Sequence, residues 1–180
     1  PCYVGQMSEG DLDCLDESIA TNSNIVAVGE IGLDYYIQNA REEKQAVFFE
    51  RQVKIACQRD LPLMLHVRKA HDQVASVLKK KKFDCGGVIH CYSGSLQQAK
   101  RYLELGFKLG IGGVITYTRA TRLRHIVQEL PLSSFVLETD APDIPVFGRE
   151  KERNSPEYLP EILSAFAELR PEAEDVVENR

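Results

Sequence analysis

Five short apolar runs constrain the fold of this chain more than any other feature of its sequence. Each run is too short for a helix, and its apolar residues stand on consecutive rather than alternate positions. That pattern is typical of strands buried on both faces of a parallel sheet. The five predicted strands are Ile25–Gly29, Leu61–Leu65, Gly87–Ile89, Phe107–Ile111 and Phe135–Leu137.

Helical patterns lie between and after these runs, with apolar residues three or four positions apart and polar residues on the other side. They cover Ala46–Ala56, Leu96–Leu103, Leu123–Leu130 and Leu159–Phe166. Ser93 or Ser95 suits the cap of the second helix. Repeated strand–helix units predict an α/β protein with a parallel sheet. The 180 residues suffice for a single domain over residues 1–180.

The charge balance excludes one class of nucleic-acid-binding protein. The chain has 22 basic and 27 acidic residues and a net charge of −5, so bulk positive charge does not hold a nucleic acid. Metal ions in an enzyme could still supply positive charge locally. The apolar runs are far shorter than a membrane span, and the first residues do not resemble a signal peptide. Five cysteines without a C-x-x-C pair favour free thiols in the cytoplasm.

Polar residues follow the predicted strands where each strand ends. Glu30 follows the first, His66 the second, His90 the third, and Glu138 and Asp140 the fifth. Functional groups of parallel α/β folds gather at the carboxyl ends of strands. Mixed imidazole and carboxylate ligands suit Zn²⁺, Mn²⁺ or Mg²⁺. The pattern predicts a shared metal site, although one such residue alone would indicate only a hydrogen-bonding role.

Two groups of basic residues have different interpretations. Arg68 and Lys69 come just after His66, so Arg68 could bind a substrate phosphate with its planar guanidinium, or form a salt bridge instead. The run Lys79–Lys82 closes a predicted helix, where cations are favoured, and a solvated helix end explains it better than nucleic-acid binding.

Four further positions remain open to ordinary structural roles. His71 suits the surface of a helix terminus, and His125 a structural or solvent-facing position within a helix. Cys91 is predicted to be a buried inert thiol. Gly112–Gly113 permits either a close approach of another segment or a plain turn.

Four segments resemble the signature motifs of the TatD family of metal-dependent hydrolases, in the order and spacing of that family. The resemblance covers nearly the whole chain, and the four motifs together are very specific. They are Val28–Tyr36 (VGEIGLDYY), Leu61–His66 (LPLMLH), Ile89–Gly94 (IHCYSG) and Leu137–Pro142 (LETDAP).

The resemblance implies a TIM-barrel fold of the amidohydrolase type and a deoxyribonuclease that hydrolyses phosphodiester bonds of DNA with two divalent metal ions. Matched residue by residue, it makes Glu30 the carboxylate that bridges the ions. His66 and His90 become ligands of one ion, and Asp140 a ligand of the other, close to the attacking water. Asp140 could also accept the proton of that water.

The chain departs from the family pattern in two respects. It contains no H-x-H pair, which supplies two ligands of the second ion in the family, and it has five predicted strands where the barrel has eight. It therefore resembles strands four to eight of such a barrel, and Pro1 resembles a residue just after strand three.

Two expectations follow from this departure. These 180 residues alone should be poorly soluble or self-associated through exposed strand edges, and they should have little or no nuclease activity. An aminoacyl-ester or amide hydrolase with the same metal-dependent fold is an alternative to the nuclease. A non-catalytic protein that has lost one metal site is another.

Overall fold

A computed structural model describes residues 1–38 and 40–172 of the chain. The chain divides into two compact units, and each is described by itself. Unit 1 comprises Pro1–His90 and Lys100–Phe107, and unit 2 comprises Cys91–Ala99 and the described part of Lys108–Arg180.

Unit 1 contains three parallel strands. β1 pairs with β2, and β2 pairs with β3. The register places Gly32 opposite His66 and His66 opposite His90, so the carboxyl ends of the three strands meet at one edge. The elements of this unit are α1 (Glu9–Thr21), β1 (Val28–Asp34), α2 (Glu42–Gln58), β2 (Leu63–Arg68), α3 (His71–Lys81) and β3 (Gly87–His90).

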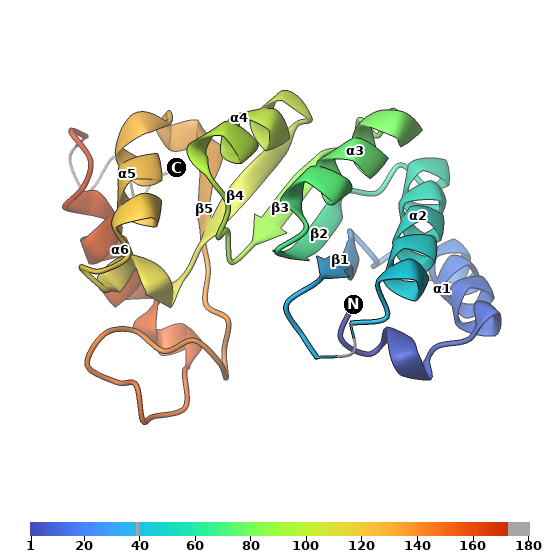
Figure 1. Cartoon of the computed structure of the whole chain (residues 1–180), viewed down its shortest axis with the longest axis horizontal. Coiled ribbons are helices and arrows are strands. Elements are labelled where there is room, and N and C mark those ends of the chain that lie inside the picture. Colours follow the sequence, from blue (N-terminus) through green and yellow to red (C-terminus); the bar gives the residue numbers. More distant parts are fainter. Residues whose placement is uncertain (39, 173–180) are drawn as a thin grey trace. The chain divides into compact units, whose positions relative to one another are not determined.

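The packing of unit 1 explains these elements. Alternate residues of β2 are buried, whereas His66 and Arg68 lie among its less buried positions. The apolar face of α2 contributes the fully buried Phe49, Val53 and Ala56, and α1 lies beside α2 (Figure 1). A capping box between Ser8 and Asp11 begins α1 by satisfying amide groups of its first turn.

Unit 2 is built on two parallel strands. β4 (Phe107–Ile111) pairs with β5 (Phe135–Leu137). Helix α5 (Thr121–Glu129) lies between them in sequence, and α6 (Leu159–Ala167) contacts β5, with the Phe135 and Phe166 rings edge to face at 5.3 Å. Helix α4 (Leu96–Glu104) spans the division between the two units. Short 3-10 helices lie at Val4–Gln6, Gly113–Thr116, Leu132–Ser134 and Pro156–Tyr158.

The structure confirms the predicted α/β class and all five predicted strands. The bounds of the last two strands are as predicted, but β1 begins at Val28 and continues to Asp34. Glu30 therefore lies within a strand instead of just after one. The register of β1 against β2 shifts between Val28 and Ile31, and such irregularities can re-aim a side chain near a functional site.

Two helical features differ from the sequence predictions. Helix α1 was not predicted, since Leu12 is its only buried residue and its apolar pattern is correspondingly weak. His71 is buried, which corrects the predicted surface position, because its ring packs edge to face on Tyr102. The predicted cap at Ser95 is confirmed, since Ser95 Oγ accepts a hydrogen bond from the Gln98 amide at 3.2 Å.

Candidate metal centre

Three of the predicted ligands converge at the carboxyl ends of the strands in unit 1. His66 Nδ1 lies 3.6 Å from Glu30 Oε2, and His90 Nε2 lies 3.6 Å from Glu30 Oε1. The two imidazoles thus approach different oxygens of one carboxylate. The structure brings these three side chains, which are far apart in sequence, to one place in the fold.

The spacing of these atoms suits a divalent cation. Protein nitrogen and oxygen ligands lie about 2.0–2.2 Å from Zn²⁺, so two atoms that share an ion are roughly 3–4 Å apart. Both separations, each 3.6 Å, fall in that range. Each imidazole and the Glu30 oxygen nearest to it therefore fit two ligands of a bound metal ion.

The protonation of Glu30 also suits metal binding. Its pKa is lowered, first by its polar contact with His66, against the opposing effect of burial, and further by the charges of His90 and His66. The Glu30 side chain is 40% exposed and that of His90 only 10% exposed. A carboxylate that stays ionised and open to solvent beside two imidazoles is accessible to a cation.

Asp34 is a functional candidate that the sequence analysis missed. Its carboxylate is buried, and Oδ2 lies 3.1 Å from His66 Nε2. An ionised carboxylate only accepts hydrogen bonds, so Nε2 carries the donated proton and Nδ1 presents its lone pair to Glu30. A metal ion between Nδ1 and the Glu30 carboxylate would satisfy both electron-pair donors. Asp34 therefore orients His66 as carboxylates orient metal-binding histidines.

Gln45 on α2 holds Asp34 in place. Its Oε1 accepts a hydrogen bond from the Asp34 amide at 2.7 Å, and its Nε2 donates to the Asp34 carbonyl at 3.0 Å. The Asp34 Oδ1 accepts a hydrogen bond from the Tyr36 amide at 2.9 Å, which leaves Oδ2 for His66. Gln45 is buried, so its hydrogen bonds fix the backbone of Asp34, and the Tyr36 amide orients the carboxylate.

Cys2 adds a thiol to this neighbourhood. Its Sγ and ligand atoms of Asp34 and His66 all lie within 4.8 Å of one another. Cys2 is exposed, so the thiol is accessible to solvent. No sequence motif marked it, because its partners lie more than thirty positions away.

Arg68, the predicted substrate contact, follows His66 at the end of β2. Its guanidinium carbon lies 3.8 Å from the centre of the Tyr36 ring, and Lys69 Nζ lies 4.5 Å from the same centre. Asp34 and Arg68 are register partners across β1 and β2. The salt bridge considered as the alternative for Arg68 does not form with any residue in the described parts of the chain.

Asp140, the fourth predicted ligand, belongs to unit 2. It follows β5, is partly buried, and its carbonyl accepts a hydrogen bond from the Asp143 amide at 2.6 Å. Glu138, at the end of β5, accepts a hydrogen bond from the partly buried Cys91 through its amide at 2.5 Å. Glycine at 110 leaves room for this carboxylate, since a Cβ there would lie 2.7 Å from Glu138 Oε1.

The close approach considered for Gly112–Gly113 is confirmed at its second residue. A Cβ at Gly113 would lie 2.7 Å from the carbonyl oxygen of Ile144, so a side chain there would displace the backbone after β5.

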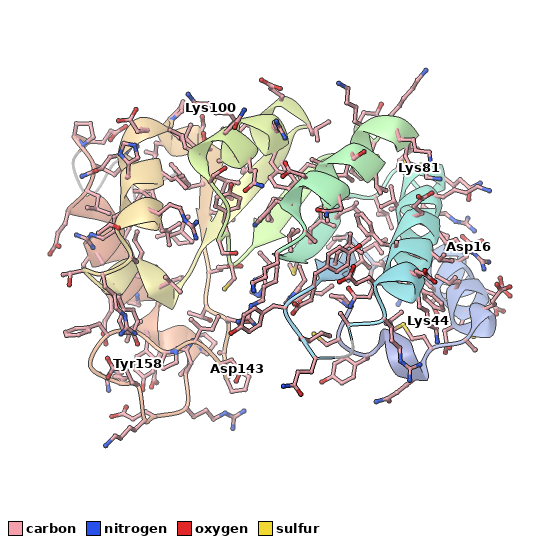
Figure 2. The ribbon with its side chains drawn as sticks, viewed as in Figure 1. Asp16, Lys44, Lys81, Lys100, Asp143 and Tyr158 are labelled. Atoms are coloured by element: carbon pink, nitrogen blue, oxygen red, sulfur yellow. The ribbon has the colours of Figure 1, made fainter. Side chains whose placement is uncertain are left out.

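His125 and the lysines at the end of α3 lie outside the candidate metal centre. His125 is exposed and lies 4.0 Å from Glu129. Lys81 lies at the end of α3 (Figure 2), and its ammonium pairs with Glu50 at 3.0 Å.

Comparison with known proteins identifies relatives over the whole sequence. The family model for TatD related DNase matches residues 1–180. The chain is 41% identical over 178 residues to the uncharacterized metal-dependent hydrolase YjjV of Escherichia coli K12, covering 98% of this chain and 69% of that protein. It is 36% identical over 160 residues to the 3'-5' ssDNA/RNA exonuclease TatD of a Rahnella species, covering 86% of this chain and 61% of that protein.

A solved structure of a TatD homologue is also similar to this chain. The crystal structure of Escherichia coli YjjV, a TatD homologue, superposes with a TM-score of 0.96 at 40% identity, over 99% of this chain and 70% of that one. Within the described residues, no helix is both long and apolar enough to cross a membrane. On the family match and on the identity to YjjV, this chain belongs to the TatD family of metal-dependent hydrolases.

Proposed function

We propose that this chain acts in the divalent-metal-dependent hydrolysis of phosphodiester bonds, as a TatD-like deoxyribonuclease. The observation that carries the proposal is the convergence of His66 and His90 on the two oxygens of Glu30 at 3.6 Å. The name of the Rahnella relative, an ssDNA/RNA exonuclease, supports a nucleic-acid substrate. The five cysteines, none of them in a disulfide, support a cytoplasmic location.

The residues take distinct roles in this proposal. Glu30 would be a shared ligand of two divalent ions (Zn²⁺, Mn²⁺ or Mg²⁺), with His66 and His90 as further ligands of one and Asp140 as a ligand of the other. When bound, such ions supply Lewis-acid charge and lower the pKa of a water molecule. Asp140 accepts the proton of the attacking water, and Arg68 binds the substrate phosphate. The family's motif, Leu137–Pro142 in this sequence, supports the assignment of Asp140.

We further propose that residues 1–180 form one domain of TIM-barrel type, in which the five strands correspond to strands four to eight. The alternation of parallel strands and helices supports this assignment. The greater length of the relatives agrees with it, since the chain covers 69% of YjjV.

The test is hydrolysis of a single-stranded oligodeoxynucleotide with Mn²⁺, Zn²⁺ or Mg²⁺, with and without chelator. We expect slow cleavage that chelator abolishes, slow because the sequence lacks the H-x-H ligands. Replacing Asp140 with asparagine should reduce the rate by about 100-fold or more, the usual contribution of a proton acceptor. Asp13→Asn, an equal charge change on the exposed face of α1, should leave the rate unchanged.

Three results would contradict this proposal. Cleavage that persists in chelator would exclude metal-dependent chemistry. Faster hydrolysis of an aminoacyl ester than of the oligonucleotide would favour the ester hydrolase. Metal binding without cleavage of either substrate would favour the non-catalytic protein.

A further inference from the structure

Two cations share one aromatic ring beside the candidate metal centre. Arg68 stacks on Tyr36 with its guanidinium carbon 3.8 Å from the ring centre, and Lys69 Nζ lies 4.5 Å from that centre. We call these three residues the Tyr36 cluster. The Tyr36 residue is 54% exposed, and both cations are exposed, so the cluster is open to a ligand.

The position of the cluster follows from strand geometry. His66 and Arg68 are two residues apart in β2, so their side chains leave the same face of the sheet, roughly 7 Å apart along the strand. Tyr36 comes two residues after Asp34, the register partner of Arg68. The cluster therefore lies on the face that presents His66, within reach of one extended substrate.

The positive charge of the cluster is not neutralised by the protein. Within residues 1–38 and 40–172, no carboxylate pairs with Arg68 or Lys69. Five other described arginines have carboxylate partners, whereas Arg41, Arg122 and Arg124 donate to backbone carbonyls instead. The pairs are Arg51–Glu9, Arg59–Asp16, Arg101–Asp72, Arg149–Glu152 and Arg170–Glu172.

Holding two cations together in this way has a cost that a bound anion would offset. Like charges repel, and the side chains lose rotamer freedom when they stack. The Tyr36 ring compensates in part through cation–π attraction and limits the positions of the guanidinium. A guanidinium held in this way presents a planar set of donors that matches the oxygens of a phosphate.

We propose that the Tyr36 cluster binds a backbone phosphate of single-stranded nucleic acid and thereby selects anionic over neutral ester substrates. This inference deepens the proposed function and rests on it, since the phosphate belongs to the strand that the metal centre cleaves. Arg68 donates to the phosphate oxygens, Lys69 adds a second charge, and Tyr36 positions Arg68. A neutral ester would leave both cations without a partner.

Binding without hydrolysis tests the cluster separately from the metal centre. The probe is a fluorescein-labelled octamer of deoxythymidylate, measured by fluorescence anisotropy with the full chain in chelator at several salt concentrations. We expect Arg68→Ala to weaken binding by about 10-fold, as loss of a hydrogen bond to a charged group does. The slope of log Kd against log salt should fall by about 0.7, the value for one phosphate contact on a single strand.

Matched variants distinguish the contribution of the Arg68 charge from that of the Tyr36 ring, and both from a general effect of substitution. Tyr36→Leu should weaken binding by about threefold to tenfold, whereas Tyr36→Phe keeps the ring face and should bind like the wild type. Arg68→Lys keeps the charge, loses the planar donors and should give an intermediate Kd. Lys79→Ala removes one charge from the exposed end of α3 and should change neither Kd nor salt slope.

Two outcomes would overturn the inference. One is a wild-type chain that does not bind the octamer in chelator. The other is an Arg68→Ala variant with the same Kd and salt slope as Lys79→Ala. Failure of the proposed function would look different, because octamer binding would persist while the chain neither bound a divalent ion nor cleaved the strand.

Discussion

Replacing Glu30 with glutamine is expected to weaken binding of a divalent cation by about 100-fold or more. Loss of an outer residue that only orients a ligand typically costs 10- to 100-fold in metal affinity, and Glu30 contributes a ligand charge itself. Its carboxylate faces both imidazoles at 3.6 Å, so the amide removes the negative charge from the middle of the site. Calorimetric titration of the metal-free chain with Zn²⁺ or Mn²⁺ measures the change.

The control for this variant is Glu43→Gln, which makes the same chemical change on the exposed surface of α2. It should bind the metal as the wild type does, and circular dichroism should show that both variants are folded. Equal affinity in the Glu30→Gln and Glu43→Gln chains would show that the ion binds elsewhere.

Replacing Gly32 with alanine is expected to destabilise the chain by several kcal/mol. A Cβ on Gly32 would lie 2.1 Å from the carbonyl oxygen of His66, and its φ of +136° is one that side chains disfavour. The neighbouring strand would have to move, and it carries a candidate ligand. Because strain of this kind adds to the cost of an unfavourable φ, unfolding by denaturant should shift far beyond the effect of an ordinary surface substitution.

The Gly148→Ala variant distinguishes the steric clash expected at Gly32 from the cost of a positive φ alone. Gly148 has a φ of +86° but no atom within 4 Å of an added Cβ, so its replacement should cost only about 1 kcal/mol. Equal stability losses at positions 32 and 148 would contradict the close packing of β1 against β2.

Most of the candidate site could be predicted from the sequence because its residues stand directly beside recognisable strand patterns. His66 and His90 follow runs of consecutive apolar residues, and such runs mark parallel strands whose carboxyl ends must lie together. Glu30 was predicted as a ligand, although its strand was placed three residues early. The apolar pattern is interrupted there by Gly29, Glu30 and Gly32, so local sequence indicates an end where the strand continues.

The parts that sequence could not predict depend on contacts between distant residues. Asp34 resembles a polar residue at a strand end until its neighbour across the sheet is known to be His66, 32 positions away. Gln45 resembles a polar position on α2, yet it is buried against the backbone of Asp34. The Tyr36 cluster likewise requires the register of β1 against β2, which no pattern within either strand specifies.

The most direct test of the metal centre observes the two imidazoles themselves. Nitrogen-15 NMR of the histidine rings, recorded as Zn²⁺ is added to the metal-free chain, distinguishes Nδ1 from Nε2. We predict that the signal of His66 Nδ1 shifts on binding while its Nε2 stays protonated against Asp34, and that His90 responds through Nε2. Coordination of His66 through Nε2, or unchanged signals of both rings at saturating Zn²⁺, would contradict the assignment of Glu30, His66 and His90 as a metal site.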